Sequence, residues 1–422
     1  MGRSMHKDHN RKNRLWIMNI DHALDKHTTN KGFLNILTKY MMLVEPNDKF
    51  IVLPNIGKES LSYVTKTRKL IFTEDWAIQL KNISNPFDTI DSIMNDSNAV
   101  SKLKELSSTN SYFIEPYIPS LKLLTLSNVL GIPLSESGYS ALENNNYIKL
   151  NDKYLFKKLS EELGVRTINY SLASTKDELN ALIKSVGKKY NKLIIKKTFS
   201  TGGYGNLCGK PNELISLIDD WYHHDELVLV EPFVDIEETL GSLAYVDKEQ
   251  YHFIGIDKQN IKAGGWKGCE YPYFSEPVSS LVEELTIRYA KYMLKNGIEG
   301  YLNLDWAVVR ENGEIVLYAL ENNYRYNGFS FVLDLAKKVF GLCPKDAVIS
   351  YDSWYELSSI IKDNEALSSK IDHINRLFSE SNVGGAVRTN MLKQNKVELM
   401  LVTNSQQSMG ILKDLTRSLL AA

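Results

Sequence analysis

The chain has 422 residues, and typical domains of about 100–200 residues predict two to four of them. Hydrophobic residues make up 43% and charged residues 24%, a balance that excludes a chain disordered throughout. The 50 basic and 51 acidic residues give a formal net charge of −1, which argues against a nucleic acid as the main partner because backbone binding needs a basic surplus.

The cysteines and the apolar runs exclude further classes. Cys208, Cys269 and Cys343 lie far apart, so neither a disulfide scaffold nor a Cys-rich zinc site is expected. No apolar run approaches the ~20 residues that span a bilayer. The basic segment 1–14 is not followed by an apolar stretch of signal-peptide type. We therefore expect a cytoplasmic protein with no membrane partner.

Residues 15–150 alternate short apolar runs with helical patterns, which predicts a small α/β layer domain. The apolar runs predict strands over 15–20, 50–53 and 70–72, and the periodicity of 31–43 predicts a helix. A further helix follows the aromatic, proline-bearing segment 112–119, and Gly131 and Pro133 mark its end.

A second unit begins near Asn151, the predicted N-cap of a helix over 152–163 that ends at Gly164. The patterns that follow predict helices over 176–186, 212–221 and 282–294, strands over 193–197 and 227–234, and antiparallel strands within 239–261. The Gly- and Lys-bearing segment 261–273 is a predicted loop. Apolar runs at 301–309 and 315–323 flank a turn at 311–313 and predict a hairpin.

The last part of the chain, 346–422, predicts a small α+β unit. It contains expected helices over 354–361 and 369–378, strands over 386–390 and 397–402, and a terminal helix. We therefore expect three domains: an N-terminal α/β domain at 15–150, a central α+β domain at 151–345 and a C-terminal α+β domain at 346–422.

The Gly-rich segment 198–206 does not match the commoner phosphate-binding loops. A Walker loop fails because Tyr204 stands where its first glycine belongs, and a dinucleotide GxGxxG starting at Gly203 fails because Cys208 stands at its last glycine. What remains is a glycine-rich connection between two strands whose backbone N–H groups can approach an anion, with Lys196 adding positive charge just before it. The alternative is a hairpin that uses its glycines for turn geometry alone.

The predicted hairpin carries an oxygen-rich cluster. Glu321 and Asn323 are two residues apart and share a face of the sheet, and strand pairing can bring Asp305 onto the same face. Mg²⁺ prefers such ligands, and Arg325, two residues further on, suits a phosphoryl or carboxylate group. The alternative is an exposed hairpin face with ordinary solvated charges.

Taken in order, these segments resemble the ATP-grasp superfamily. The similarity covers residues 151–330 and rests on five short motifs that are specific only together: Asn151-Asp152-Lys153; Ile195-Lys196-Lys197 with Thr201–Gly205; Glu231-Pro232-Phe233-Val234; Asp305; and Glu321-Asn322-Asn323-Tyr324-Arg325. The sequence departs from the family pattern at Lys197, where many members have proline, and at Ser200, where glycine is frequent. The resemblance implies the ATP-grasp fold, two α+β subdomains that clasp ATP, with flanking N- and C-terminal domains.

The resemblance also implies a role for each motif residue. Lys153 and Lys196 would hold the ATP phosphates under a lid containing Thr201, Gly202, Gly203 and Gly205. Glu231 and Val234 would contact adenine through their backbones, with Phe233 beside it. Either Glu237 or Glu238 would bind the ribose, and Lys258 would reach the phosphates. Asp305, Glu321 and Asn323 would hold Mg²⁺, and Arg325 would stabilise an acyl phosphate.

In architecture the chain looks most like the pheganomycin-type peptide ligases and related amino-acid ligases. This implies that ATP activates an amino-acid or peptide carboxylate as an acyl phosphate, releasing ADP and phosphate, for attack by an amine. Two alternatives stay open: transfer of the amino acid to the thiol of a carrier protein, and a nucleotide-binding module without catalysis. The complete set of Asp305, Glu321 and Asn323 argues against the last.

Three other segments have less specific readings. The run 223–226, His-His-Asp-Glu, has no distant partner ligand and reads as a solvated loop rather than a metal site. Cys208 and Cys269 lack the His spacing of a nucleophile. In the predicted loop 261–273, we expect Trp266 to cover the acceptor while Lys262 and Lys267 form a basic rim.

Overall fold

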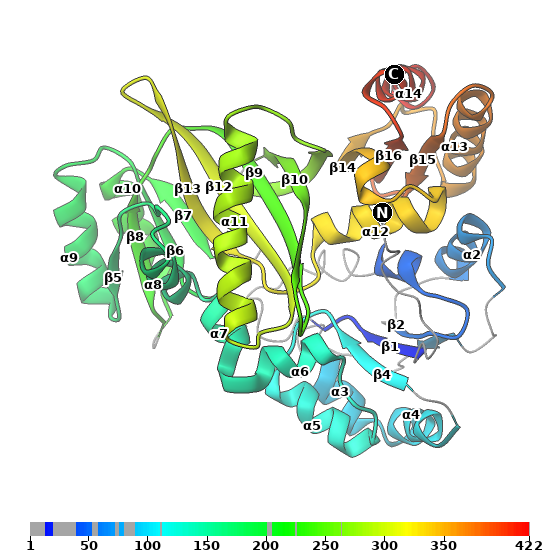
Figure 1. The fold of residues 1–422 in the computed structure, drawn as a ribbon, viewed down its shortest axis with the longest axis horizontal. Coiled ribbons are helices and arrows are strands. Elements are labelled where there is room, and N and C mark those ends of the chain that lie inside the picture. The colour runs from blue at the N-terminus through cyan, green and yellow to red at the C-terminus, as the bar shows by residue number, and fades with distance from the viewer. Residues whose placement is uncertain are drawn as a thin grey trace. The chain divides into compact units, whose positions relative to one another are not determined.

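The structure is a computed structural model, and it describes residues 13–19, 39–52, 58–71, 76–79, 89–109, 112–200, 205–223, 226–262 and 264–421 (Figure 1). These residues form two compact units, one ending at Leu142 and the other starting at Glu143.

The first unit contains a four-stranded parallel sheet in the order β3-β2-β1-β4. Its strands are β1 (Asn13–Ile17), β2 (Lys49–Val52), β3 (Ala77–Gln79) and β4 (Tyr112–Pro116). The predicted α/β layer is therefore confirmed, although β3 and β4 were not expected. The strand predicted over 70–72 is wrong at Leu70 and Ile71, which are irregular, and Phe72 lies outside the described residues.

Helices cover this sheet and build its core. They are the 3₁₀ helix η1 (Lys39–Leu43), α2 (Lys58–Arg68), α3 (Thr89–Asn95), α4 (Ser97–Thr109), α5 (Leu121–Leu130) and α6 (Glu136–Leu142). Of the helix predicted over 31–43, residues 39–43 form η1 and the rest lie outside the described part. As expected, α5 ends at Gly131, whose φ of 67° places it in the left-handed region that glycine tolerates best.

The second unit opens with η3 (Glu143–Asn145), α7 (Asn146–Asn151) and α8 (Lys153–Glu162). Asp152, not Asn151, is the N-cap of α8, because its carboxylate accepts the backbone N–H groups of Tyr154 and Leu155. Asn151 is instead the last residue of α7. The predicted cap is thus wrong by one residue, which leaves the Asn151 side chain available for another contact.

A small antiparallel sheet follows, in the order β5-β8-β6-β7. Its strands are β5 (Ser171–Ala173), β6 (Leu193–Lys197), β7 (Asn206–Gly209) and β8 (Val228–Pro232), and its helices are α9 (Lys176–Gly187) and α10 (Pro211–Trp221). Both helices and both central strands agree with the sequence. Leu179, Ile183, Leu214 and Ile218 bury the inner faces of the helices against Ile195 and Val230.

The other sheet of this unit has eight antiparallel strands in the order β13-β12-β9-β10-β11-β14-β16-β15. They are β9 (Ile236–Val246), β10 (Tyr251–Lys262), β11 (Gly265–Tyr271), β12 (Gly300–Glu311), β13 (Glu314–Asn322), β14 (Val348–Glu356), β15 (Gly384–Arg388) and β16 (Lys396–Thr403). The β12–β13 pair is the hairpin that the sequence predicts. Strands β14 to β16 come from residues 346–422 and continue the same sheet.

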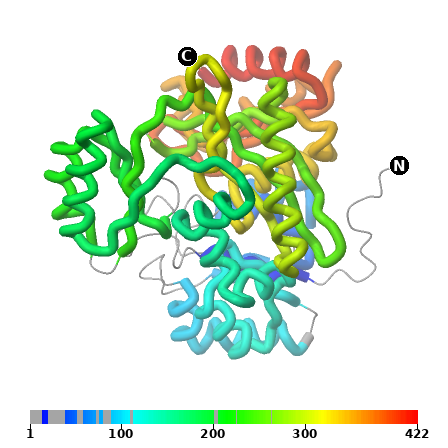
Figure 2. The backbone as a smooth tube through the Cα atoms, turned by 60° about the vertical axis from the view of Figure 1, so that its left-hand side comes forward, coloured from blue at the N-terminus to red at the C-terminus, as the bar shows by residue number. Residues whose placement is uncertain are grey.

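Four helices pack on this sheet: α11 (Val278–Lys295), α12 (Gly328–Phe340), α13 (Asn364–Ser379) and α14 (Gln406–Leu420), with the 3₁₀ turn η4 (Pro344–Asp346) after α12. In Figure 1, α11 lies across β9, β10 and β12, where Ser242, Thr286 and Trp306 share buried hydrogen bonds. Figure 2 shows α13 and α14, orange and red, side by side. No helix in the described ranges has the length and apolar character needed to cross a membrane.

Two local predictions in this unit are wrong. The loop expected over 261–273 is mostly strand β11, which pairs with β10 and β14. The helix expected over 354–361 is absent, because 354–356 complete β14 and the residues after them are irregular. In both places one partner strand, β14 for β11 and β16 for β14, comes from a distant part of the sequence, so local periodicity does not reveal it.

Candidate active site

The predicted carboxylate cluster forms where β12 and β13 pair. Asp305 lies directly opposite Glu321, and the register shifts just after Asp305 because Leu320 bulges out of the ladder. The Asn323 side-chain amide donates to Asp305 Oδ2 at 3.0 Å. The structure therefore brings Asp305, Glu321 and Asn323 together at the end of the hairpin.

The two carboxylates have different electrostatic environments. Burial raises the pKa of Asp305 well above its usual value, and the neighbouring Glu321 carboxylate raises it further. Burial acts in the same sense on Glu321, but the Lys153 ammonium, 3.1 Å away, together with Lys196 and Arg325 outweighs it and holds the pKa of Glu321 below its usual value. A cation between the two carboxylates would relieve their repulsion.

The donor set fits a hard divalent ion. Two carboxylates and an amide oxygen are ligands that Mg²⁺ accepts together with phosphate oxygens. Within the described ranges, no group of three or more His, Cys, Asp or Glu side chains is placed to hold a metal ion. An ion here would thus need the amide of Asn323, or oxygens from a bound substrate, to complete its coordination.

Two predicted phosphate-binding lysines lie at this site. Lys153 starts α8, and its Nζ atom is 2.8 Å from the carbonyl oxygen of Ser200, 3.2 Å from Ser200 Oγ and 3.1 Å from Glu321. Lys196 lies on β6, with Nζ 2.8 Å from Glu231 Oε2. Glu231 also pairs with Lys157 at 3.0 Å, a buried lysine that the sequence reasoning did not single out.

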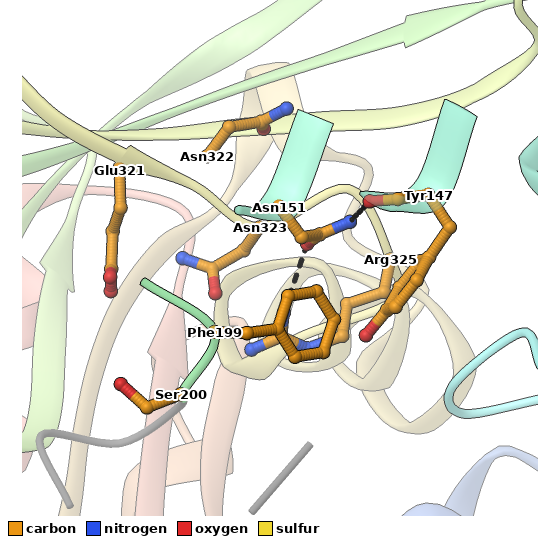
Figure 3. A pocket seen from close by; sticks show the side chains of 8 residues that line it. All are labelled: Tyr147, Asn151, Phe199, Ser200, Glu321, Asn322, Asn323 and Arg325. Carbon is orange, nitrogen blue, oxygen red and sulfur yellow. Dashed lines mark hydrogen bonds between the residues drawn. The ribbon is translucent and has the colours of Figure 1, made fainter. Parts of the chain in front are cut away.

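Arg325 follows the hairpin and is positioned by Asn151. The Asn151 side-chain carbonyl accepts the backbone N–H of Tyr324 at 2.9 Å and Arg325 Nη1 at 3.3 Å, while its amide donates to the Tyr147 carbonyl at 2.8 Å. Figure 3 shows these side chains together in a pocket. The pocket is lined by Tyr147, Asn151, Phe199, Ser200, Glu321, Asn322, Asn323 and Arg325.

On β10 the residue beside the carboxylates is Gln259, which the sequence reasoning missed. Its amide donates to Asp305 Oδ1 at 2.6 Å. Neighbouring residues of a strand point to opposite faces, so Lys258 points away from Asp305 and pairs with Glu238. Glu238 also accepts the Tyr273 hydroxyl at 2.6 Å, and Glu237 accepts Arg310 at 2.8 Å. Both ribose candidates are therefore engaged by side chains of the protein.

The predicted hinge 231–234 is the end of β8 and the residues after it. Glu231 is fully buried, whereas the Phe233 ring is partly exposed and carries Lys192 Nζ 3.7 Å from its centre. The Phe233 N–H bonds to the Lys192 carbonyl at 3.0 Å, which fixes the start of this segment against β6. Val234 follows in irregular structure and is half-buried.

The predicted lid lies partly outside the described residues. Thr201, Gly202 and Gly203 belong to the part that the structure does not describe. Gly205 is described: its carbonyl accepts the Lys197 N–H at 2.8 Å, and a Cβ atom at this position would lie 2.4 Å from the Ser200 side chain. A glycine is therefore required there by close approach rather than by backbone angle.

The remaining candidates lie away from the carboxylates or pack structurally. All three cysteines are free thiols, with Cys269 buried and Cys208 exposed. His223 follows α10, and the next two residues of the 223–226 run are outside the described part.

Trp266, expected to cover an acceptor, stacks on Tyr351 with ring centres 5.6 Å apart. Trp266 thus belongs to strand β11 rather than to a loop, and its role as a cover over the acceptor stays a prediction.

Comparisons with known proteins give partial sequence matches and a match of the fold. No family model matches the chain. It is 26% identical over 204 residues to the C-terminal section of the carbamoyl phosphate synthase large chain of Aquifex aeolicus (strain VF5), covering 46% of this chain and 36% of that protein. It is 33% identical over 111 residues to the D-alanine–D-alanine ligase of Helicobacter pylori (strain P12), covering 26% and 31%. The chain thus spans about a third of the length of these relatives.

The fold has a match over almost its whole length. A β-γ-ATP complex of biotin carboxylase from Campylobacter jejuni superposes with a TM-score of 0.61 and 13% identity, over 97% of this chain and 91% of that one. The chain therefore has the ATP-grasp fold, in agreement with the resemblance of its motifs to the ATP-grasp superfamily.

Proposed function

We propose that this protein is an ATP-dependent carboxylate–amine ligase. It activates an amino-acid or peptide carboxylate as an acyl phosphate, converting ATP to ADP and phosphate, and an amine then displaces the phosphate to form an amide. The observation that carries the proposal is the meeting of Asp305, Glu321 and Asn323 with Lys153 at the end of one hairpin. A cationic side chain next to oxygens that can bind a metal ion suits a polyphosphate.

In this proposal the cationic side chains bind the triphosphate. Lys153 and Lys196 contact its oxygens, and Lys153 exchanges its present partner Glu321 for a phosphate. Asp305, Glu321 and Asn323 would hold Mg²⁺, which supplies neutralisation of phosphate charge. Gln259 holds Asp305 Oδ1, and therefore fixes the direction of the other carboxylate oxygen.

Arg325 serves the carboxylate that is activated. Asn151 holds one side of its guanidinium, so its remaining N–H donors are directed by a rigid helix end rather than by a loop. A planar guanidinium can bind the substrate carboxylate and then the acyl phosphate that replaces it. The backbone of Glu231–Val234 binds adenine beside Phe233, and Glu237 or Glu238 binds the ribose after leaving its present partner. Residues 151–345 would thus form the nucleotide-binding and catalytic domain.

The acceptor is the least constrained part of the proposal. We favour a small amine, because a net charge of −1 gives no sign of a broad basic surface for an acidic carrier protein. Transfer to a carrier-protein thiol is the alternative, since it uses the same activation. A competition between free amino acids and a phosphopantetheinylated carrier, read by mass spectrometry, separates them: a soluble amide supports our choice, and a loaded carrier reverses it.

The activity is tested by the nucleotide product. Purified protein is incubated with ATP, Mg²⁺ and pools of amino acids and dipeptides, and the spent nucleotide is separated by chromatography. The proposal predicts ADP and phosphate that depend on one pool, together with a hydroxamate when hydroxylamine replaces the amine. AMP and pyrophosphate as the main products would contradict it, because they indicate an adenylated intermediate.

A further inference from the structure

Behind the phosphate-binding lysines lies a buried cluster of three charges. Lys157 is one helical turn after Lys153 on α8, so both side chains are on the same face of the helix. Its side chain is 1% exposed, that of Glu231 is 0% exposed and that of Lys196 is 11% exposed. A lysine this deeply buried is unusual unless it is paired.

Each of the two lysines contacts a different carboxylate oxygen of Glu231. Glu231 Oε1 accepts Lys157 at 3.0 Å, and Glu231 Oε2 accepts Lys196 at 2.8 Å. Lys157 also donates to the Ile168 carbonyl at 3.0 Å, and its Nζ atom lies 5.3 Å from the centre of the Tyr170 ring. These contacts of Lys157 come from different segments, and Glu231 is the contact that it shares with Lys196.

The cluster carries a net positive charge because of Lys157. Burial lowers the pKa of Lys157 and Lys196 acts in the same sense, so the pKa of Lys157 stays below its usual value although Glu231 opposes the shift. Burial raises the pKa of Glu231, but the two lysines outweigh it and hold that pKa below its usual value. Two ammonium groups and one carboxylate leave one positive charge. With Lys157 absent, Glu231 would cancel the charge of Lys196, the lysine that faces the nucleotide in the proposed function.

We infer that Lys157 is a positioning residue for nucleotide binding: it neutralises Glu231 so that Lys196 keeps its positive charge for the triphosphate. The inference rests on the proposed function, since it assumes that Lys196 contacts phosphate. Stability alone does not call for such a cluster, because well-packed apolar side chains often replace buried ion pairs without loss. Lys157 acts through Lys196 and does not touch the nucleotide.

The test removes the charges of Lys157 and Glu231 singly and together, and measures the binding of two ligands. Dissociation constants for ATP and for adenosine are measured by calorimetry on the wild-type chain, Lys157→Met, Glu231→Gln and the double variant. Lys157→Met should weaken ATP binding roughly tenfold and leave adenosine within about twofold, because only the phosphates sense the lost charge. The double variant should regain ATP affinity, because Lys196 is then no longer neutralised. Lys158→Met, on the exposed side of α8, is the matched control and should bind ATP like the wild type.

Several results would overturn the inference. These are an unchanged ATP affinity in Lys157→Met, an equal loss for adenosine, or a double variant as weak as the single one; the last two would indicate a packing role. If Lys157→Met does not fold, Glu231→Gln alone decides, and it should bind ATP more tightly than the wild type, whereas weaker binding contradicts the inference. Failure of the wild-type chain to bind ATP would instead contradict the proposed function.

Discussion

At the residue scale, the site contains two carboxylates, Asp305 and Glu321, which make different contacts. Asp305 is held from two sides, by Gln259 at one oxygen and Asn323 at the other. Glu321 is paired with the long side chain of Lys153, which can exchange Glu321 for a phosphate. Glu321 is therefore the member better able to bind an incoming ion, and its removal tests the site.

Glu321→Ala should lower turnover at least ~100-fold, the loss typical when one transition-state contact is deleted. Its thermal unfolding should stay close to that of the wild type, since Glu321 is not part of the apolar core. Glu314→Ala, at the exposed far end of the same strand, is the control and should keep full activity. Phosphate release at the wild-type rate by Glu321→Ala would remove this carboxylate from the site.

A second prediction concerns Asp257 on β10, which is fully buried. Burial raises the pKa of Asp257 to about 7, although the Cys269 thiol and the Gly241 N–H oppose the shift. The unfolded chain loses this proton at a pH of about 4, whereas the native state keeps it until about pH 7. The free energy of unfolding therefore falls as the pH rises between these two values. Between pH 5 and 8, the free energy of unfolding of the wild type should fall by roughly 2–3 kcal/mol relative to Asp257→Asn.

Urea unfolding of both proteins at the two pH values measures this difference. The variant controls for the titrating groups that Asp257 does not influence, and the charge of Asp257 also raises the pKa of Asp305 and of Tyr271. Parallel pH profiles for the wild type and Asp257→Asn would show that Asp257 is not held protonated in the native state.

At the scale of elements, the sequence predicts best where the structure is local. The hairpin β12–β13 was predictable because two apolar runs flank a three-residue turn. Helix α5 was predictable because Gly131 and Pro133 mark its end, and helices α9 and α10 because of their periodicity. Strand β11 was not predictable, because its glycines and lysines are typical of a loop and its partner β14 lies some eighty residues away in the sequence. Ladder pairing over such distances overrides local preference.

A glycine in β11 provides a prediction for this element. Gly268 has φ 149°, and a Cβ atom there would lie 1.9 Å from the Tyr351 carbonyl oxygen on β14. Gly268→Ala should therefore destabilise the protein by at least ~2 kcal/mol, because both the backbone angle and the strand contact must change. The measurement is the urea midpoint at constant m-value.

Gly410→Ala is the matched control for that substitution. Gly410 lies in helix α14, and a Cβ atom at this position would have no neighbour within 4 Å among the described residues. Alanine should be neutral or stabilising by up to ~1 kcal/mol, because it is the better helix former. A Gly268→Ala protein as stable as Gly410→Ala would contradict the close β11–β14 pairing.

At the scale of the whole molecule, fold class and motif order were predictable, and the contacts between motifs were not. Asp305, Glu321 and Asn323 could be named because alternation places them on one face. Lys157 and Gln259 could not, because their roles depend on Glu231 and Asp305, which approach them only through tertiary packing. The register that points Lys258 away from the carboxylates is likewise set by the β9–β10 pairing.

The central claim is that the substrate carboxylate attacks ATP to form an acyl phosphate. The most direct test uses a substrate whose carboxylate carries ¹⁸O in both oxygens, with mass analysis of the phosphate released during amide formation. Our account predicts one ¹⁸O atom transferred to each phosphate, with ADP as the other product. Unlabelled phosphate, or ¹⁸O found in AMP, would contradict it.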